Sequence, residues 1–203
     1  MRHEDITKTS VLLNPRCGGS DTGLVGEAGD LVLMEKEANL ALCYVLAGHL
    51  AFNGIHVQMT RYDDSKLTYK KRVGIANDLL PNLVVSLGMS RLTWGRPAIQ
   101  THDFSINSEL VAEFLRMSID EWGFSDHFTK VRREREGIVG KTISACVRVS
   151  LGNIATHPEH LEKFSDMNFI NEYASILANS LLESFKRVVW NSKEFSSALY
   201  SEL

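Results

Sequence analysis

The sequence predicts an α/β protein with a single domain, built on a mainly parallel, twisted sheet with helices on both faces. Short apolar runs at residues 11–13 (VLL) and 83–87 (LVVSL) are typical of buried strands. Longer segments between such runs carry apolar residues at every third or fourth position, which is the spacing of one helix face. No repeat, low-complexity tract or linker interrupts this alternation. We therefore divide the chain into a polar arm at 1–9, one domain at 10–190 and a tail at 191–203.

The first predicted strand leads into a loop that we expect to contain the functional site. Asn14 and Pro15 stop the apolar run, and Gly18, Gly19 and Gly23 then shape a tight polar segment. Open α/β sheets place their sites at the carboxyl edge, in the loops that leave the strand ends. The sequence therefore predicts a site in this loop.

The other elements follow from the same two periodicities. A long helix begins at Glu35 and stops at Asn53-Gly54, which is an ordinary helix end. Further helices are expected at 67–79, 108–122 and 168–190. Strands are expected at 55–61, 83–87, 98–104, 130–139 and 144–151.

The bulk composition excludes several classes of function. A net charge of -3 and a pI near 6.2 give no electrostatic reason to expect a nucleic-acid partner. No apolar run is long enough to span a bilayer. The N-terminus MRHEDITKTS lacks the apolar core of an export signal, so we expect the protein to be cytoplasmic at synthesis. Cys17, Cys43 and Cys146 have no metal-type spacing among themselves, which fits a reducing compartment or a protein that needs no disulfide.

Six segments, taken in order over residues 10–190, resemble the motifs of one enzyme family. That family is the zinc-dependent N-acetylmuramoyl-L-alanine amidases of type 3, which cut the lactyl-to-peptide amide of peptidoglycan. The similar segments are NPRCGGSDTG, MEKEANLAL, NGIHVQMTRYDD, LTYKKRVGIAN, LVVSLGMS and VRVSLGNIATHPEHLEKF. No single motif is decisive, and the evidence is their order and spacing.

The resemblance also implies where the catalytic groups should be. Such an amidase binds zinc through two histidines and a glutamate, and a second glutamate serves as general base and acid. The first histidine position is Cys17, and the glutamate ligand is retained as Glu35. The second histidine position is Gly88, which has no side chain, and the catalytic glutamate position is Ser150. The chain is thus similar to a degenerate member of the family.

We therefore expect no zinc or other cofactor and no catalytic residue. Cys17 and Glu35 are legitimate ligands, but two ligands do not make a stable site. His102, Ser86 or Ser90 could add a third group, although nothing in the spacing calls for one. A serine at the base position would also cost about 10²–10⁴-fold in rate. No motif provides a base for Cys17 or for the serine as a nucleophile, so inert replacement is the preferred interpretation.

Two arginines stand where the family carries none, and they suggest what fills the metal position. Arg16 replaces a glycine of the first motif, and Arg148 lies on the same strand face as Ser150. We hypothesise that one of them pairs with Glu35, with Arg16 pointing into solvent as the alternative. The expected remnant pocket consists of Arg16, Cys17, Glu35, Arg148 and Ser150.

The sequence thus favours a pseudoenzyme, kept as a structural or adaptor subunit of a larger assembly. Because no export signal or wall-binding module is visible, the chain resembles phage-encoded cell-wall proteins, and a phage virion or tail-like machine is the expected assembly. A peptidoglycan-binding module that uses the old groove and a divergent active amidase are the alternatives.

The tail at 191–203 carries Phe195, Leu199 and Leu203 at steps of four. This pattern predicts a short amphipathic helix that docks on the domain or on a neighbour, with a frayed end as the alternative.

Overall fold

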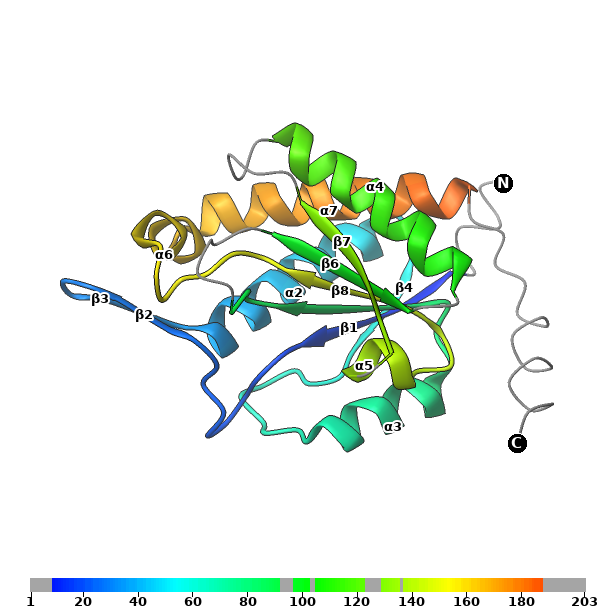
Figure 1. Cartoon of the computed structure of the whole chain (residues 1–203), viewed down its shortest axis with the longest axis horizontal. Coiled ribbons are helices and arrows are strands. Elements are labelled where there is room, and N and C mark those ends of the chain that lie inside the picture. The colour runs from blue at the N-terminus through cyan, green and yellow to red at the C-terminus, as the bar shows by residue number, and fades with distance from the viewer. Residues whose placement is uncertain (1–8, 92–96, 103–104, 123–128, 136, 188–203) are drawn as a thin grey trace.

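The computed structural model describes residues 9–91, 97–102, 105–122, 129–135 and 137–187. Its centre is a six-stranded sheet with the order β4-β1-β5-β8-β6-β7, and a separate hairpin is formed by β2 and β3 (Figure 1). The strands are β1 (Ser10–Pro15), β2 (Val25–Ala28), β3 (Leu31–Met34), β4 (His56–Met59), β5 (Leu83–Gly88), β6 (Ala98–His102), β7 (Lys130–Glu134) and β8 (Ala145–Ser150). The helices are α2 (Glu35–Phe52), α3 (Tyr69–Leu79), α4 (Ile106–Trp122), α5 (Gly137–Lys141), α6 (Pro158–Ser165) and α7 (Met167–Arg187).

The sheet is mainly parallel, which confirms the predicted fold class. β1 pairs in parallel with β4 and β5, and β5 pairs in parallel with β8. β6 is antiparallel to β8, and β7 then runs parallel to β6. The carboxyl ends of β1, β5 and β8 consequently meet at one edge of the sheet, where the first loop begins.

Alternating side chains divide the interior into two layers. Val11 and Leu13 of β1 belong to the large core beneath α2, α4 and α7, whereas Leu12 belongs to a smaller cluster beneath α3 and α5. Figure 1 shows α4 and α7 on one side of the sheet and α3 and α5 on the other. The continuous apolar runs of β1 and β5 follow from this arrangement, because both faces of a central strand are buried.

The boundary of one predicted strand is wrong. β7 ends at Glu134, and the residues after 136 form α5 instead of continuing the strand predicted over 130–139. Gly137, with a φ of 67°, has the left-handed conformation that turns the chain out of the sheet direction. The β2–β3 hairpin was not predicted, because its strands lie outside the main sheet and are only partly buried, which weakens their period-two signal.

Several predictions concern residues that the structure does not describe. They are the arm at 1–8, the last residues of the strand predicted over 98–104, and the tail helix at 191–203. α7 is described as far as Arg187, three residues short of the predicted end. Among the described residues, no helix is both long enough and apolar enough to cross a membrane.

The end of α3 offers a test of backbone strain. Leu80 caps this helix with φ 47° and ψ 52°, a left-handed conformation in which a leucine side chain is exposed. Because left-handed geometry costs an L-residue roughly 1–2 kcal/mol, Leu80→Gly should raise the free energy of unfolding by about 1 kcal/mol. Urea denaturation measures this change. Leu79→Gly, one residue earlier and inside the helix, should instead lower it by about 1 kcal/mol; equal effects at both positions would contradict the strain argument.

Candidate functional site

The loop after β1 is a tight turn that its own backbone fixes. The Arg16 N–H donates to the Leu87 carbonyl at 3.0 Å, so the chain leaves the sheet beside the end of β5. Gly18 and Asp21 exchange two backbone hydrogen bonds of 2.8 and 3.1 Å. Gly18 has a φ of 137°, and a Cβ there would lie 2.3 Å from the Ser65 carbonyl oxygen. Glycine is therefore required at this turn.

Two buried arginines hold the carbonyl groups of this loop. Arg61 donates to the carbonyl oxygens of Pro15 and Arg16, at 3.2 Å each. Arg72 donates to those of Pro15 and Cys17, at 2.8 and 2.6 Å. Buried carbonyls need such partners because water does not reach them. The two guanidinium groups thus take the place of a regular backbone ladder where the chain leaves β1.

The same arginines attach the loop to the rest of the domain. Arg61 also donates to the carbonyl oxygens of Lys36 at 2.8 Å and Asp63 at 2.7 Å. Arg72 donates to the side-chain oxygen of Asn14 at 2.7 Å. Burial, assisted by the neighbouring Arg61 guanidinium, lowers the pKa of Arg72 to about 10, so Arg72 stays charged at neutral pH. Strand β1, helix α2 and the segment after β4 are thereby joined.

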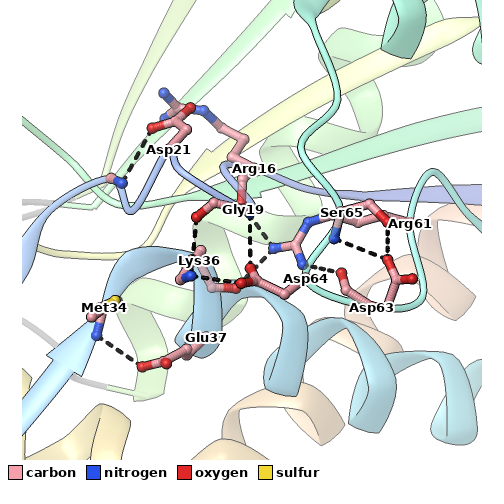
Figure 2. A network of polar contacts seen from close by, with 11 residues as sticks. Arg16, Gly19, Asp21, Met34, Lys36, Glu37, Arg61, Asp63, Asp64 and Ser65 are labelled. Atoms are coloured by element: carbon pink, nitrogen blue, oxygen red, sulfur yellow. Dashed lines mark hydrogen bonds and ion pairs between the residues drawn. The ribbon is translucent and has the colours of Figure 1, made fainter.

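The outer rim of the loop is held by a smaller polar network, which Figure 2 shows from close by. Lys36 Nζ donates to Asp64 at 2.6 Å and to the Gly19 carbonyl at 3.1 Å. The Gly19 N–H in turn donates to Asp64 at 2.9 Å. The hydrogen bond from Lys36 keeps the pKa of the Asp64 carboxyl below its ordinary value. The loop after β1 and the segment after β4 are therefore both held against the start of α2.

Glu35, the first residue of α2, has a fully buried carboxylate. Its Oε2 accepts the Leu24 N–H at 3.0 Å, and its Oε1 accepts the Met89 N–H at 2.9 Å. Nδ2 of Asn39 lies 3.5 Å from the same Oε1. A buried carboxylate is costly unless such groups compensate it. Glu35 therefore cross-links the segment before β2, the start of α2 and the end of β5.

The Arg16 side chain turns inward, toward Glu35 and Gly88. Its Nη1 lies 3.7 Å from Oε1 of Glu35, and its side chain is only 22% exposed. A Cβ built on Gly88 would lie 2.5 Å from Cδ and 2.7 Å from Nη1 of Arg16. The arginine therefore occupies the space that any side chain at position 88 would need. This is the pairing hypothesised for one of the two arginines.

Cys17 lies in the same pocket and is held as a neutral thiol. A Cβ on Gly23 would lie 2.8 Å from its Sγ and 2.5 Å from Oε2 of Glu35, so sulfur and carboxylate share one small space. Burial, and then the nearby carboxylates of Glu35 and Asp21, raise the pKa of Cys17 to about 12. A thiol with such a pKa is a weak nucleophile near neutral pH.

The predicted residues on β8 lie on the same sheet face, at two different depths. Ser150 is buried and pairs in register with Gly88, so it belongs to the edge where Arg16 lies. Arg148 is two residues further from that edge, in register with Ser86 on one side and Gln100 on the other. The sheet therefore brings Ser150 to the site edge and places Arg148 two residues further from that edge along the same face.

Of the additional candidate ligands, the strand order places His102 away from the edge where Cys17 and Glu35 lie. Because β6 runs antiparallel to β8, Ala98 is the residue that pairs with Ser150, and His102 lies four residues away, roughly 13 Å along the strand. The Ser86 hydroxyl accepts a hydrogen bond of 2.8 Å from a side chain of β1, and the Ser90 N–H donates to the segment after β8. Within the described ranges, no group of three or more His, Cys, Asp or Glu side chains could hold a metal ion.

Comparison with known protein families identifies the class to which this α/β chain belongs. The sequence profile described as N-acetylmuramoyl-L-alanine amidase matches residues 11–183, which is most of the chain. The chain therefore belongs to the N-acetylmuramoyl-L-alanine amidase family, as the resemblance predicted. A comparison with curated protein sequences gave no match.

Solved structures with the same fold are amidases of low sequence identity. The amidase AmiC2 of Nostoc punctiforme has a TM-score of 0.76 and 22% identity, over 89% of this chain and 98% of that one. The catalytic domain of CwlV from Bacillus (Paenibacillus) polymyxa var. colistinus has a TM-score of 0.76 and 22% identity, over 88% and 98%. The CwlD amidase from Clostridioides difficile, solved in complex with the GerS lipoprotein, has a TM-score of 0.79 and 16% identity, over 89% and 100%. These likenesses support the fold.

The residues of this chain do not fit the zinc ion of the family. A catalytic zinc needs three protein ligands and an open position for water. Gly88 offers no donor, and the carboxylate of Glu35 already accepts two backbone N–H groups. The neighbouring group is the Arg16 guanidinium, whose positive charge would oppose a dication. The donor set is thus too small, and the guanidinium of Arg16 lies beside it.

The sequence analysis missed the groups that compensate the pocket. Asn39, Arg61 and Arg72 carry most of its hydrogen bonds, together with the Met89 N–H. One signal was available for Arg72, because it lies one helical turn before the buried Ala76 on the inward face of α3. A backbone N–H donor gives no comparable signal in a sequence.

The hydrogen bonds from the Arg72 guanidinium to the loop carbonyls should contribute most to the stability of the loop. Arg72→Met would remove the guanidinium that donates to the Cys17 carbonyl and one of the two guanidinium donors to the Pro15 carbonyl. A buried group left unpaired costs about 1–3 kcal/mol, and each lost hydrogen bond from a charged donor adds to this cost. We expect the free energy of unfolding to fall by at least about 3 kcal/mol, measured by urea denaturation. The exposed neighbour Lys71 is the matched control, and Lys71→Met should change it by less than about 0.5 kcal/mol. Similar small decreases in the free energy of unfolding for both variants would contradict this role of Arg72.

Arg16 and Gly88 should be energetically coupled. Gly88→Ala places a methyl group where the Arg16 side chain lies, so the arginine must leave Glu35. The same substitution in an Arg16→Gly background meets no such atom. A double-mutant cycle on the free energy of unfolding should give a coupling of about 1 kcal/mol. Strictly additive effects would show that Arg16 does not occupy this space.

Proposed function

We propose that this chain is a pseudoenzyme of the amidase family, acting as a structural or adaptor subunit of a larger assembly. The observation that carries the proposal is the position of Arg16, with Nη1 3.7 Å from the Glu35 carboxylate and its side chain over Gly88. The guanidinium of Arg16 places a positive charge beside the buried glutamate. A charge supplied in this way would let the carboxylate stay buried without a metal ion.

The remaining groups also argue against hydrolysis. Amide cleavage by such a site needs an activated water and a carboxylate that takes its proton. Ser150, at the family's general-base position, has a hydroxyl group that is a far weaker base than a carboxylate. Cys17 is a thiol whose pKa is raised by burial, so it does not replace the missing nucleophile. We therefore assign no catalytic residue and no cofactor to this chain.

An adaptor role fits what has been kept. Hydrogen bonds from Arg61 and Arg72 hold the loop after β1. The shape of the sheet edge at this loop therefore does not depend on a metal ion or on catalytic groups. A protein partner is consistent with the printed description of the CwlD amidase, which was solved in complex with the GerS lipoprotein. We place the assembly in a phage virion or tail-like machine, following the expectation from the sequence.

A peptidoglycan-binding module is the second candidate. Its support is that the chain belongs to a family of peptidoglycan amidases and retains the fixed loop at the family's site edge. In this role the old groove would bind the wall polymer without cutting it. An active amidase would need ligands and a base that these residues do not provide.

The proposal predicts the metal content and activity of the purified protein. The wild-type chain should contain far less than one zinc per chain by mass spectrometry and should release no peptide from muropeptides. The variant Arg16→Gly/Cys17→His/Gly88→His/Ser150→Glu restores the ligand and base types, so its zinc content should rise. Wild-type protein with one zinc per chain and muropeptide cleavage would refute the pseudoenzyme. Co-sedimentation with insoluble peptidoglycan separates the two candidates, because the adaptor should stay in the supernatant.

A further inference from the structure

The outer face of α4 carries a stripe of apolar side chains. Ile106, Leu110, Phe114 and Met117 follow one another at steps of four, four and three residues, which places them on one side of the helix. Ile106 is 73% exposed, Leu110 is 42% exposed and Met117 is 58% exposed, while Phe114 is half-buried. We call these four residues the α4 stripe. Contiguous apolar surface of this kind marks a contact site more often than a single exposed residue does.

The α4 stripe is not part of the core of the domain. Val111, Leu115 and Ile119 face the sheet and α7 from the opposite side of the helix, and all three are buried. The flank of the helix between the two faces is polar, where Arg116 forms ion pairs with Glu113 at 2.7 Å and Asp120 at 3.1 Å. The helix therefore has two apolar faces, and the described part of the chain buries one of them.

The end of α7 points to what covers the second face. The last described residue of α7 is Arg187, and its guanidinium carbon lies 5.7 Å from the centre of the Phe114 ring, within the α4 stripe. The chain continues from this point as residues 188–203. As a helix, this segment would be roughly 24 Å long, and the stripe spans only about 16 Å, so the segment can reach all of it.

The spacing of the segment matches the spacing of the stripe. Phe195 and Leu199 are separated by four residues, and Leu203 follows at the same step. Ile106 and Leu110 show that step on α4. When two helices each present a row of side chains at i and i+4, the rows pack into each other's grooves.

We propose that residues 188–203 dock on the α4 stripe of their own chain through Phe195, Leu199 and Leu203. The attachment at Arg187 keeps the segment beside its site, so binding within one chain is favoured over binding by a neighbour. This inference is independent of the proposed function, because it requires nothing of the amidase site.

Methionine oxidation tests the proposal in the full-length protein. Met117 of the stripe is 58% exposed and Met167 at the start of α7 is 57% exposed, so the described residues shield them equally. Under dilute hydrogen peroxide, Met117 should become the sulfoxide more slowly than Met167, as peptide mass spectrometry measures, because the segment covers it. Equal rates in the wild-type protein would overturn the proposal.

Two full-length variants complete the test. Phe195→Ser/Leu199→Ser removes the docking side chains, so the rate at Met117 should rise to that at Met167. Ser197→Ala, on the other side of the same predicted helix, should leave the protection unchanged. Protection that survives in Phe195→Ser/Leu199→Ser would overturn the proposal. Protection that is lost on dilution would also overturn it, since the segment of a second chain would then be the occupant.

Discussion

The site edge of this protein depends on two buried guanidinium groups that satisfy the carbonyls of one loop. Where β1 ends, the chain turns sharply, and three successive carbonyls lose the partners that a strand would give them. Arg61 and Arg72 supply those partners. Arg61 also donates hydrogen bonds to carbonyls of α2 and of the segment after β4. Because each guanidinium offers up to five donors in a fixed plane, two of them hold an irregular loop that no backbone ladder could hold.

A second constraint is the buried charge of Glu35. Burying a carboxylate is unfavourable unless hydrogen bonds and an opposite charge compensate it. In a metalloenzyme of this family the zinc ion supplies that charge, whereas here the Arg16 guanidinium lies 3.7 Å away and two backbone N–H groups donate to the oxygens. The glutamate has thus become a cross-link between three segments. The absence of a side chain at Gly88 provides the space in which the Arg16 side chain lies.

Much of the fold could be predicted, because continuous apolar runs and helical periodicity report burial directly. The helix beginning at Glu35 and the strand at 83–87 are examples. The β2–β3 hairpin and the turn at Gly137 could not, since partly buried strands and short helices leave weak patterns. The position of His102 depended on the antiparallel direction of β6, which no local pattern encodes.

The sequence by itself determined which groups stand at the site edge, since the identity of a residue is sufficient to show that Gly88 has no side-chain donor and that Ser150 has no carboxylate. It also determined the fold class, through periodicities that depend only on neighbouring residues. The tertiary structure alone decided which of the two arginines approaches Glu35. Arg16 and Arg148 were equivalent candidates in the sequence, and the direction of a side chain is set by packing between distant segments. In the loop after β1, packing turns the Arg16 side chain inward, so that it fills the space over Gly88 and lies 3.7 Å from Glu35.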